Sequence, residues 1–333
     1  MMSKNGGFLS VRDLVVEYTA EGQVIHAVNG VSFDLERGKT FGLVGETGAG
    51  KTSTAKAILR ILPDPPAKIR AGEIFLDGID LLKINEREMR KIRGRKVSMI
   101  FQDPMTALNP IMKIGEQIAE VIKLHNKISK DGANEQAMQM LEKVGIPRER
   151  FNEYPHQFSG GMKQRVVIAI ALACSPELLL ADEPTTALDV TIQAQVLGMI
   201  NKLKDDFNTS MIMISHNLGV VAEVCDDIGV IYAGEIIELG SKEAIFDHPT
   251  HPYTLGLFKA VPHLYDEEDR LSPITGLPPD PSNLPTGCHF SPRCPYATAE
   301  CRNQEIELRE IGSGHFCRCI KVNNEEGIDA NIS

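Results

Sequence analysis

The chain has 333 residues, of which 42% are hydrophobic and 24% charged, a composition that excludes general disorder and allows one large domain with a smaller one. The net charge of −10 gives the protein no bulk attraction to nucleic acid or anionic lipid, so we expect no nucleic-acid partner. No run approaches the roughly 18 apolar residues of a membrane-spanning helix, and the N-terminus lacks the pattern of a signal peptide. We therefore expect a cytoplasmic protein that reaches a membrane only by docking on another protein.

The first part of the chain is predicted to fold as strands that lead into a loop and a helix. Residues 8–18 and 28–35 are rich in Val, Leu and Phe, with a Gly-bearing turn between them. Residues 40–44 form a short apolar run, and residues 52–62 have helical spacing that ends at Pro63. A strand, a glycine-rich loop and a helix in that order give the local structure that a phosphate-binding loop needs.

The glycine-rich loop, called the phosphate loop below, matches the pattern G-x-x-x-x-G-K-[ST]. Its residues are Gly45, Glu46, Thr47, Gly48, Ala49, Gly50, Lys51 and Thr52, and Ser53 follows them. The glycines let backbone N–H groups turn toward phosphate oxygens, and the positive end of the helix dipole adds to that attraction. Lys51 is expected to reach the β- and γ-phosphates, and the Thr52 hydroxyl to ligate Mg²⁺. The alternative, a plain glycine turn, is disfavoured by the flanking strand and helix.

Further along the chain, the apolar pattern predicts both helices and strands. The expected strands are residues 96–101, 178–182, 211–215, 228–232 and 235–239, and the expected helices lie within residues 110–150 and at residues 161–174. The runs at 178–182 and 211–215 are continuous and apolar, which favours strands covered on both faces of a parallel sheet. The last two strands flank Ala233 and Gly234, which predicts a hairpin.

Two carboxylates stand at the end of the strand expected at residues 178–182. Asp182 would lie at the edge of the sheet and hold Mg²⁺ through water. Glu183 follows directly and is expected to polarise the attacking water as general base. The alternative is a pair of solvated acids at a strand end, and the phosphate loop upstream favours the catalytic interpretation.

A second candidate anion site precedes the helix expected at residues 161–174. Ser159, Gly160 and Gly161 together place a hydroxyl and two flexible residues at a helix start. One nucleotide does not need two separate phosphate cradles, so we expect the second cradle to serve a nucleotide bound to another subunit. The alternative is an ordinary N-cap followed by a flexible turn.

The chain changes character after Gly240. Residues 271–287 carry prolines at positions 273, 278, 279, 281 and 285 and show neither helical nor alternating periodicity. This pattern predicts an extended linker. The tail after it is short and has too little apolar content for a large core, so we expect a metal centre to help fold it.

Five of the seven cysteines lie in that tail: Cys288, Cys294, Cys301, Cys317 and Cys319. A reducing cytoplasm argues against structural disulfides, which favours metal binding. Four thiolates are the ligand set of a [4Fe–4S] cluster, and the spacing is wider than that of zinc knuckles. An iron–sulfur cluster, a zinc site and free or partly paired thiols all remain open at this point.

Taken in chain order, the motifs resemble those of the ATP-binding subunits of ABC transporters. They are the phosphate loop (Walker A), Gln102 in Phe101-Gln102-Asp103-Pro104, Ser159-Gly160-Gly161, Asp182-Glu183, Ala187-Leu188-Asp189, and His216 after an apolar strand. The resemblance implies an α/β P-loop NTPase fold of ABC type. Its core sheet would be mixed and mainly parallel, with an antiparallel β subdomain, a helical subdomain and a small C-terminal cysteine-rich domain.

The resemblance also implies three parts along the chain. Residues 1–240 would form the nucleotide-binding domain, with the helical subdomain at about 103–175. Residues 241–287 would form an extension and Pro-rich linker, and residues 288–333 the cysteine-rich metal-cluster region.

Catalytic roles follow from the same resemblance. Gln102 would sense the γ-phosphate, contact Mg²⁺ beside Thr52 and Asp182, and relay the nucleotide state to a membrane partner. His216 would contact the γ-phosphate and orient the attacking water with Glu183.

Other residues would bind the nucleotide or the partner subunit. Tyr18 falls where the family places an aromatic ring that stacks on adenine, the alternative being an edge-strand aromatic. Asp189 would lie at the dimer seam, and Ser159 and Gly161 would grip the ATP of the opposite subunit. Met162 replaces the glutamine of the common signature, which removes one hydrogen bond to the ribose.

Several segments are similar to one branch of the family, the oligopeptide and dipeptide importers. They are Gln102-Asp103-Pro104-Met105, Leu108-Asn109-Pro110, Thr185 to Thr191, His251-Pro252-Tyr253-Thr254, and the cysteine-rich tail. In that branch four such cysteines carry an iron–sulfur cluster. The branch's His-x-x-x-Cys ending makes Cys319 the fourth ligand beside Cys288, Cys294 and Cys301, and leaves Cys317 spare. Arg293 and Arg302 could offset the charge of a cluster, or be solvated cations.

The resemblance therefore implies an ATPase that powers import of di- and oligopeptides, with ATP, Mg²⁺ and a [4Fe–4S] cluster as cofactors. Its partners would be a second ABC ATPase subunit (a heterodimer in the transporter, a homodimer where the subunit is alone), two transmembrane permease subunits and an extracytoplasmic peptide-binding protein. It would lie peripherally on the cytoplasmic face of the inner membrane. The alternatives are the same motor for nickel or another small solute, and a soluble ABC ATPase outside transport.

Overall fold

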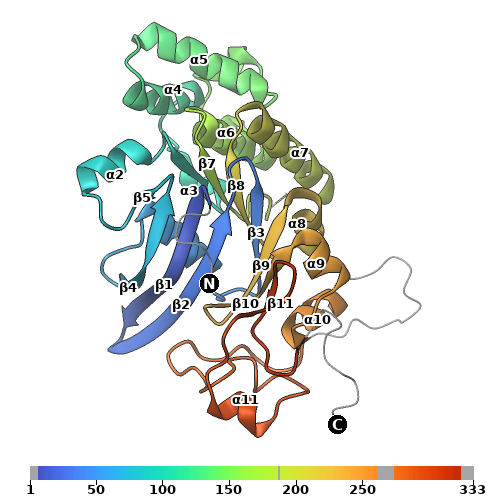
Figure 1. The fold of residues 1–333 in the computed structure, drawn as a ribbon. Helices are drawn as coiled ribbons and strands as arrows, with labels where there is room; N and C mark the ends of the chain where they lie inside the picture. Colours follow the sequence, from blue (N-terminus) through green and yellow to red (C-terminus); the bar gives the residue numbers. More distant parts are fainter. Residues whose placement is uncertain (1–6, 187, 261–273, 324–333) are drawn as a thin grey trace. The chain divides into compact units, whose positions relative to one another are not determined.

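The computed structural model describes residues 7–186, 188–260 and 274–323 (Figure 1). The chain divides into two compact units that interleave along the sequence. The first unit consists of Met1–Leu35, Thr40–Leu82 and Ile214–Ser333, and the second of Glu36–Lys39 and Lys83–Met213. The domain boundaries expected from the sequence stay a prediction.

An antiparallel sheet forms one part of the first unit, with its four strands in the order β2-β1-β4-β5. The strands are β1 (Leu9–Ala20), β2 (Gln23–Leu35), β4 (Ala67–Leu76) and β5 (Ile79–Asp80). Val16 of β1 faces Val28 of β2, and the two turn residues between these strands, Glu21 and Gly22, both have positive φ. That turn geometry matches the twist of paired strands, and the strand pair expected near the N-terminus is confirmed.

Five further strands of the first unit lie in the order β3-β9-β10-β12-β11. They are β3 (Thr40–Val44), β9 (Asp227–Tyr232), β10 (Glu235–Ser241), β11 (Arg309–Gly312) and β12 (His315–Cys317). β3 and β9 are parallel, whereas β9 and β10 form the expected hairpin through Ala233 and Gly234. Phe33 of β2 stacks on Phe41 of β3 with the ring centroids 4.6 Å apart, which packs the antiparallel sheet against β3.

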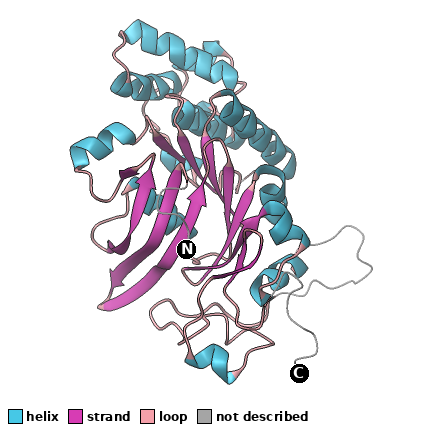
Figure 2. Ribbon diagram, in the orientation of Figure 1, coloured by secondary structure: helices cyan, strands magenta, loops and turns pink. Residues whose placement is uncertain are grey.

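The cysteine-rich tail is attached to this second group of strands. β12 pairs with β10 in antiparallel register, with Glu238 opposite Cys317, and β11 pairs with β12. Cys317, Cys319 and Val322 are buried together, and Ile311 packs against them. Within residues 288–323, the chain outside α11 and the β11–β12 pair is drawn as loop in Figure 2. The tail thus has strand pairing and a small apolar cluster that the sequence did not lead us to expect.

The described part of the Pro-rich segment, residues 274–287, contains neither helix nor strand. It is nevertheless attached to the first unit, because the backbone N–H of His26 in β2 donates to the carbonyl oxygen of Pro281 at 2.9 Å.

The helices of the first unit are α1 (Lys51–Leu59), α8 (Leu218–Val224), α9 (Lys242–Asp247), α10 (Pro252–Lys259) and α11 (Ala299–Asn303). α1 ends earlier than the sequence predicted. Arg60 takes a left-handed φ of 51°, and its N–H donates to the carbonyl oxygen of Ala57. The chain therefore leaves the helix before it reaches Pro63, which corrects the expectation that proline ends it.

The second unit contains β6 (Val97–Ile100), β7 (Leu178–Asp182) and residues 210–213 of β8 (Ser210–Ser215). β7 lies between β6 and β8, and β6 and β7 are parallel, with Val97 opposite Leu178. Every residue of β7 and β8 is buried. This confirms the expectation that these two apolar runs are strands covered on both faces.

The helices of the second unit are α2 (Glu86–Ile92), α3 (Pro104–Ala107), α4 (Ile114–His125), α5 (Lys130–Lys143), α6 (Gly160–Leu172) and α7 (Val190–Asp206), with 3₁₀ turns at Arg148–Asn152 and Pro155–Gln157. Short polar side chains begin several of them. Asn85, Ser129, Ser159 and Asp189 each accept a hydrogen bond from a backbone N–H in the first turn of the helix that follows.

Within residues 7–186, 188–260 and 274–323, no helix is long and apolar enough to cross a membrane.

Candidate nucleotide site

The phosphate loop connects β3 to α1, and two of its glycines touch neighbouring backbone. Gly45 has a φ of +156°, and a Cβ atom there would lie 2.1 Å from the carbonyl oxygen of Ile231 in β9. Gly50 has a φ of +103°, and its Cβ would lie 2.3 Å from the carbonyl oxygen of Ala27 in β2. Both contacts are too short for any side chain, so the loop can follow this path only with glycine at both positions.

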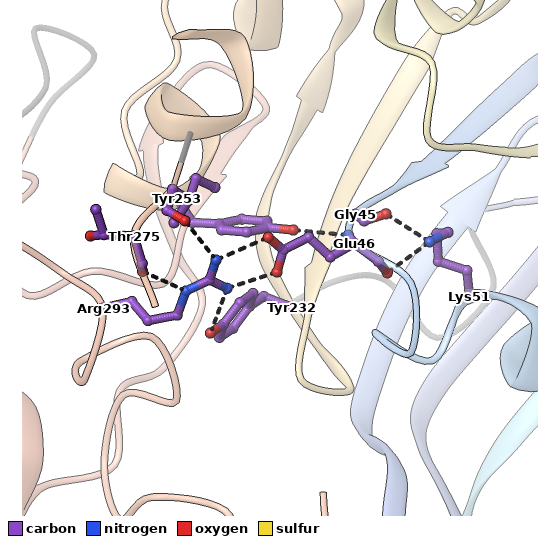
Figure 3. A network of polar contacts seen from close by, with 8 residues as sticks. Gly45, Glu46, Lys51, Tyr232, Tyr253, Thr275 and Arg293 are labelled. Atoms are coloured by element: carbon purple, nitrogen blue, oxygen red, sulfur yellow. Dashed lines mark hydrogen bonds and ion pairs between the residues drawn. The ribbon is translucent and has the colours of Figure 1, made fainter. Parts of the chain in front are cut away.

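Lys51 begins α1 and turns back toward the loop. Its side chain is buried, and Nζ donates to the carbonyl oxygens of Gly45 at 2.7 Å and Glu46 at 2.9 Å (Figure 3). α1 has Gly50 as its N-cap and no side-chain cap. A buried ammonium, glycine-shaped backbone and an uncapped helix start are the groups that bind phosphate oxygens. The residues present therefore fit the phosphates of a nucleoside triphosphate.

Tyr18 lies beside the same helix. Its hydroxyl is 3.1 Å from Oγ of Ser53, the residue that follows Thr52. β1 lies between β2 and β4, so the alternative interpretation of Tyr18 as an edge-strand aromatic is wrong.

In the second unit, Asp182 and Glu183 lie where β7 ends. Asp182 is buried. Glu183 has a φ of +47°, a conformation that residues other than glycine seldom adopt and that clusters at functional sites. Its Oε2 accepts hydrogen bonds from Nε2 of Gln102 at 2.9 Å and from Oγ1 of Thr186 at 2.8 Å. Two hydrogen-bond donors from the same unit therefore converge on one carboxylate oxygen of Glu183.

The Ser-Gly-Gly segment begins α6 in the same unit. Ser159 is the N-cap, and its Oγ accepts from the backbone N–H of Met162 at 3.4 Å. Ser159 and Gly160 are exposed, and Gly161 is half-buried, where a Cβ atom would lie 3.0 Å from Cγ2 of Ile192. The capping alternative therefore accounts for the serine side chain, while the exposed surface leaves room for contact with another chain.

The remaining nucleotide-site predictions fall on separate elements. His216 is exposed directly after β8. Asp189 is the N-cap of α7, and its Oδ1 accepts from the N–H of Ile192 at 3.0 Å. Ala187 of the Ala-Leu-Asp motif lies outside the described residues.

Four of the five tail cysteines, Cys288, Cys294, Cys301 and Cys319, line one cavity. Burial, followed by the neighbouring cysteines, raises the pKa of Cys288 to about 12 and that of Cys294 to about 11. Cys317 is fully buried on β12 and is not among the lining residues. In the described part of the chain, no three His, Cys, Asp or Glu side chains converge closely enough to hold a metal ion.

Arg293 occupies a place that the sequence did not predict. We expected it to offset cluster charge or to be solvated, but its side chain is 5% exposed and pairs with Glu46 of the phosphate loop (Figure 3). Arg302, in contrast, is exposed. The two positions that form the Arg293–Glu46 pair are 247 residues apart, so no local pattern could have connected them.

Comparison with known structures places the fold among ATP-binding cassettes. The dimeric post-hydrolysis cassette MJ0796 bound to ADP and Pi superposes with a TM-score of 0.63 over 70% of this chain and 98% of that chain, at 24% identity. The cbiO1 cassette of Clostridium perfringens gives a TM-score of 0.61 over 72% and 91%, at 23% identity. At these identities the likeness establishes the fold alone, which is the ABC-type P-loop fold that the sequence predicted.

Family models and relatives specify the branch. Residues 28–186 match the ABC transporter family, and residues 237–301 match the oligopeptide/dipeptide transporter C-terminal region. The oligopeptide transport ATP-binding protein OppD of Bacillus subtilis is 48% identical over 93% of this chain and 87% of its own length. The dipeptide transport ATP-binding protein DppD of the same organism is 50% identical over 88% of each chain. This chain belongs to the ATP-binding proteins of the oligopeptide and dipeptide ABC transporters.

Proposed function

We propose that this protein hydrolyses ATP to power the import of di- and oligopeptides through a membrane ABC transporter. One observation carries the proposal: Lys51 and the glycine-constrained phosphate loop are built to bind a triphosphate, in a chain about half identical to peptide-transport ATPases along nearly its whole length. The names of those relatives supply the peptide as cargo.

We further propose how the described groups would act on ATP. Loop N–H groups and Lys51 would hold the β- and γ-phosphates, and the Tyr18 ring would stack on the adenine. The Glu183 carboxylate, hydrogen-bonded to Gln102 and Thr186, would accept the proton of the attacking water, with His216 orienting that water. Mg²⁺, held by Thr52, Asp182 and Gln102, would neutralise phosphate charge.

The exposed start of α6 supports a shared site. Ser159, Gly160 and Gly161 would contact the ATP bound to a second ATPase subunit, and closure of the dimer around two nucleotides would precede hydrolysis. Two transmembrane permease subunits and an extracytoplasmic peptide-binding protein would complete the transporter, with this subunit on the cytoplasmic face of the inner membrane.

Reconstitution with the permease and binding-protein subunits tests the cargo. Vesicle-bound ATPase activity would be measured with dipeptides, tripeptides, longer peptides and a nickel chelate, each delivered with the binding protein. We expect stimulation by one or more peptide classes. Stimulation by the nickel chelate alone would replace peptide import by the metal-import alternative, and ATPase activity that never depends on the membrane subunits would favour a soluble ATPase.

The four cavity cysteines support a second, finer proposal: a [4Fe–4S] cluster bound by Cys288, Cys294, Cys301 and Cys319. The support is that these four thiols surround a single cavity while Cys317 does not. A cluster would supply covalent cross-links between distant parts of the tail.

Paired substitutions test the cluster proposal. Anaerobically purified protein would be assayed for iron, labile sulfide and visible absorbance. Cys319→Ser should lose the iron, and Cys317→Ser should retain it. Wild-type protein with zinc or with no metal would contradict the cluster, and iron retained by Cys319→Ser would contradict this ligand set.

A further inference from the structure

Glu46, the second residue of the phosphate loop, is held by the C-terminal part of the chain. Its carboxylate accepts two parallel hydrogen bonds from Arg293, Nη1 to Oε2 at 2.7 Å and Nη2 to Oε1 at 3.0 Å (Figure 3). The Arg293 side chain is 5% exposed and that of Glu46 28%. A fork-to-fork pair with this burial is stronger and more directional than an ion pair on the surface.

The guanidinium is itself fixed on its other sides. Nε donates to the carbonyl oxygen of Thr275 at 3.1 Å, Nη1 to the Tyr232 hydroxyl at 3.3 Å, and Nη2 to the carbonyl oxygen of Ile274 at 3.4 Å. With the two bonds to Glu46, these contacts use all five N–H donors of an arginine. Arg293 therefore holds Glu46 from a position that it cannot easily leave.

The backbone of Glu46 is held as firmly as its side chain. Its N–H donates to the Tyr253 hydroxyl of α10 at 2.9 Å, and its carbonyl oxygen accepts from Nζ of Lys51. Tyr253 is fully buried, and its ring packs against Tyr232 and Phe290, with centroids 4.6 and 5.5 Å away. A rigid aromatic cluster thus supports the loop residue that also touches the phosphate-binding lysine.

The Pro-rich segment provides a second contact with the same loop. Pro278, Pro279, Pro281 and Leu284 line a cavity of about 140 Å³ together with residues 46–49 of the loop. The C-terminal part of the chain therefore borders the phosphate loop at this cavity as well as through Arg293.

Glu46 also creates an electrostatic problem that Arg293 solves. A carboxylate within a phosphate-binding loop repels the negative charge of ATP, and at partial burial that repulsion is weakly screened. The guanidinium neutralises it. Without Arg293, the loop would be less ordered and would also carry an uncompensated negative charge.

We propose that Arg293 is a positioning residue for the phosphate loop, which through Glu46 orders the loop and cancels its negative charge so that ATP binds. The inference rests on the proposed ATPase function. Cys294 follows Arg293 directly, and Phe290 lines the cavity of the four cysteines.

The test measures equilibrium binding of ATP with Mg²⁺ to the full chain by titration calorimetry, together with KM and kcat. Arg293→Gln should weaken binding about tenfold, equivalent to about 1.4 kcal/mol, with kcat at saturating ATP changed less than about twofold. Glu46→Gln should weaken binding less, because it removes the negative charge together with the clamp. The double variant Arg293→Gln/Glu46→Gln should bind ATP better than Arg293→Gln alone.

Arg12→Gln is the matched control. Arg12 pairs with Asp34 in the same unit at similar burial, 16% and 31% exposed, and it donates hydrogen bonds to Val11, Phe33 and Asp34. It should lose comparable thermal stability and keep ATP affinity within about twofold. An equal loss of affinity in Arg12→Gln would show that Arg293 acts only through general stability.

Two further outcomes overturn the inference, and one overturns the proposed function instead. The inference fails if Arg293→Gln binds ATP as wild type does, or if the double variant is no better than Arg293→Gln. Should Arg293→Gln not fold, Arg293→Lys against the double variant makes the same comparison, with Lys expected to retain partial affinity. Wild-type protein that does not bind ATP would refute the ATPase function itself.

Discussion

The phosphate loop in the first unit and the Glu183 turn in the second are held by different kinds of contact. Neighbouring backbone confines the loop at Gly45 and Gly50, and the buried Arg293 fixes its second residue. Glu183 instead keeps a rare backbone conformation beside two side-chain donors, Gln102 and Thr186, and Gln102 is exposed. The path of the loop is thus fixed by backbone contacts and a buried ion pair, whereas the Glu183 turn is held by side-chain hydrogen bonds at the surface.

The largest expected effect tests the Glu183 turn. Glu183→Gln should lower kcat by about 10²- to 10⁴-fold, the contribution of a general base, while ATP binding stays close to wild type. Single-turnover hydrolysis and equilibrium ATP binding check this. Glu177→Gln is the control, because Glu177 also pairs with side chains of the same unit, Arg37 and Lys96. A Glu183→Gln variant with normal turnover would remove Glu183 from its role as base.

A smaller effect tests the rigidity of the loop. Gly50→Ala should weaken ATP binding about 10- to 100-fold, because its Cβ would overlap the carbonyl oxygen of Ala27 at an unfavourable φ. The control is Gly198→Ala in the exposed face of α7, where no atom lies within 4 Å of a new Cβ. That change should leave binding unaltered and stabilise the fold by about 0.5–1 kcal/mol. Unchanged ATP affinity in Gly50→Ala would contradict the view that backbone contacts fix the path of the loop.

The proposed contact of Ser159 with the ATP of another subunit predicts a still smaller change. Ser129 is a structurally matched control for it. Ser159 and Ser129 both cap helices of the second unit, so alanine at either should cost about 1 kcal/mol of stability. Only Ser159→Ala should also lower ATPase activity, about tenfold, in assays at protein concentrations that allow dimers. Equal activity of the two alanine variants would leave Ser159 as a helix cap alone.

The smallest expected effect on nucleotide binding concerns the buried Glu238 beside α10. Glu238 is fully buried and accepts hydrogen bonds from the N–H and Oγ1 of Thr250, from the N–H of His251, and from Nε2 of His315. Glu238→Gln should cost about 1–3 kcal/mol of stability and should weaken ATP binding less than threefold. Urea unfolding and ATP titration measure the two effects.

Glu238 also predicts a pH dependence. Burial acts to raise its pKa, but the hydrogen bonds from His315 and Thr250 outweigh burial and hold the pKa below the usual 4.5. Because the folded pKa lies below the unfolded one, the stabilisation is complete above about pH 4.5 and is lost as the pH falls through the folded value. The wild-type protein should lose this stabilisation as the pH falls below 5, whereas the Glu238→Gln variant should not. Parallel pH profiles for the two proteins would contradict the assignment.

Local sequence patterns predicted much of the fold. The apolar runs before Asp182 and His216 are strands, and the Ala233-Gly234 pair is a hairpin turn, because both depend on periodicity and turn chemistry within a few residues. The end of α1 was missed because Arg60 adopts a left-handed conformation there, and its side chain donates to the distant carbonyl oxygen of Leu81.

The candidate-site residues also divide into those that local sequence predicted and those that depend on contacts between distant parts of the chain. The phosphate loop was recognisable because its chemistry is contiguous along the chain. The Arg293–Glu46 pair and the separation of Cys317 from the other four cysteines depend on which strand the tail joins, and pairing between distant strands has no local signature. The roles assigned to Gln102, Ser159 and His216 stay predictions.

The pairing of β12 with β10 has a consequence for how much of the tail can be removed. β10 is a largely buried strand whose neighbours are β9 and β12. A chain ending before residue 288 would turn β10 into an open edge, with unpaired N–H and C=O groups beside apolar side chains. Such an edge invites strand-to-strand self-association, so we expect a chain shortened in this way to aggregate more readily.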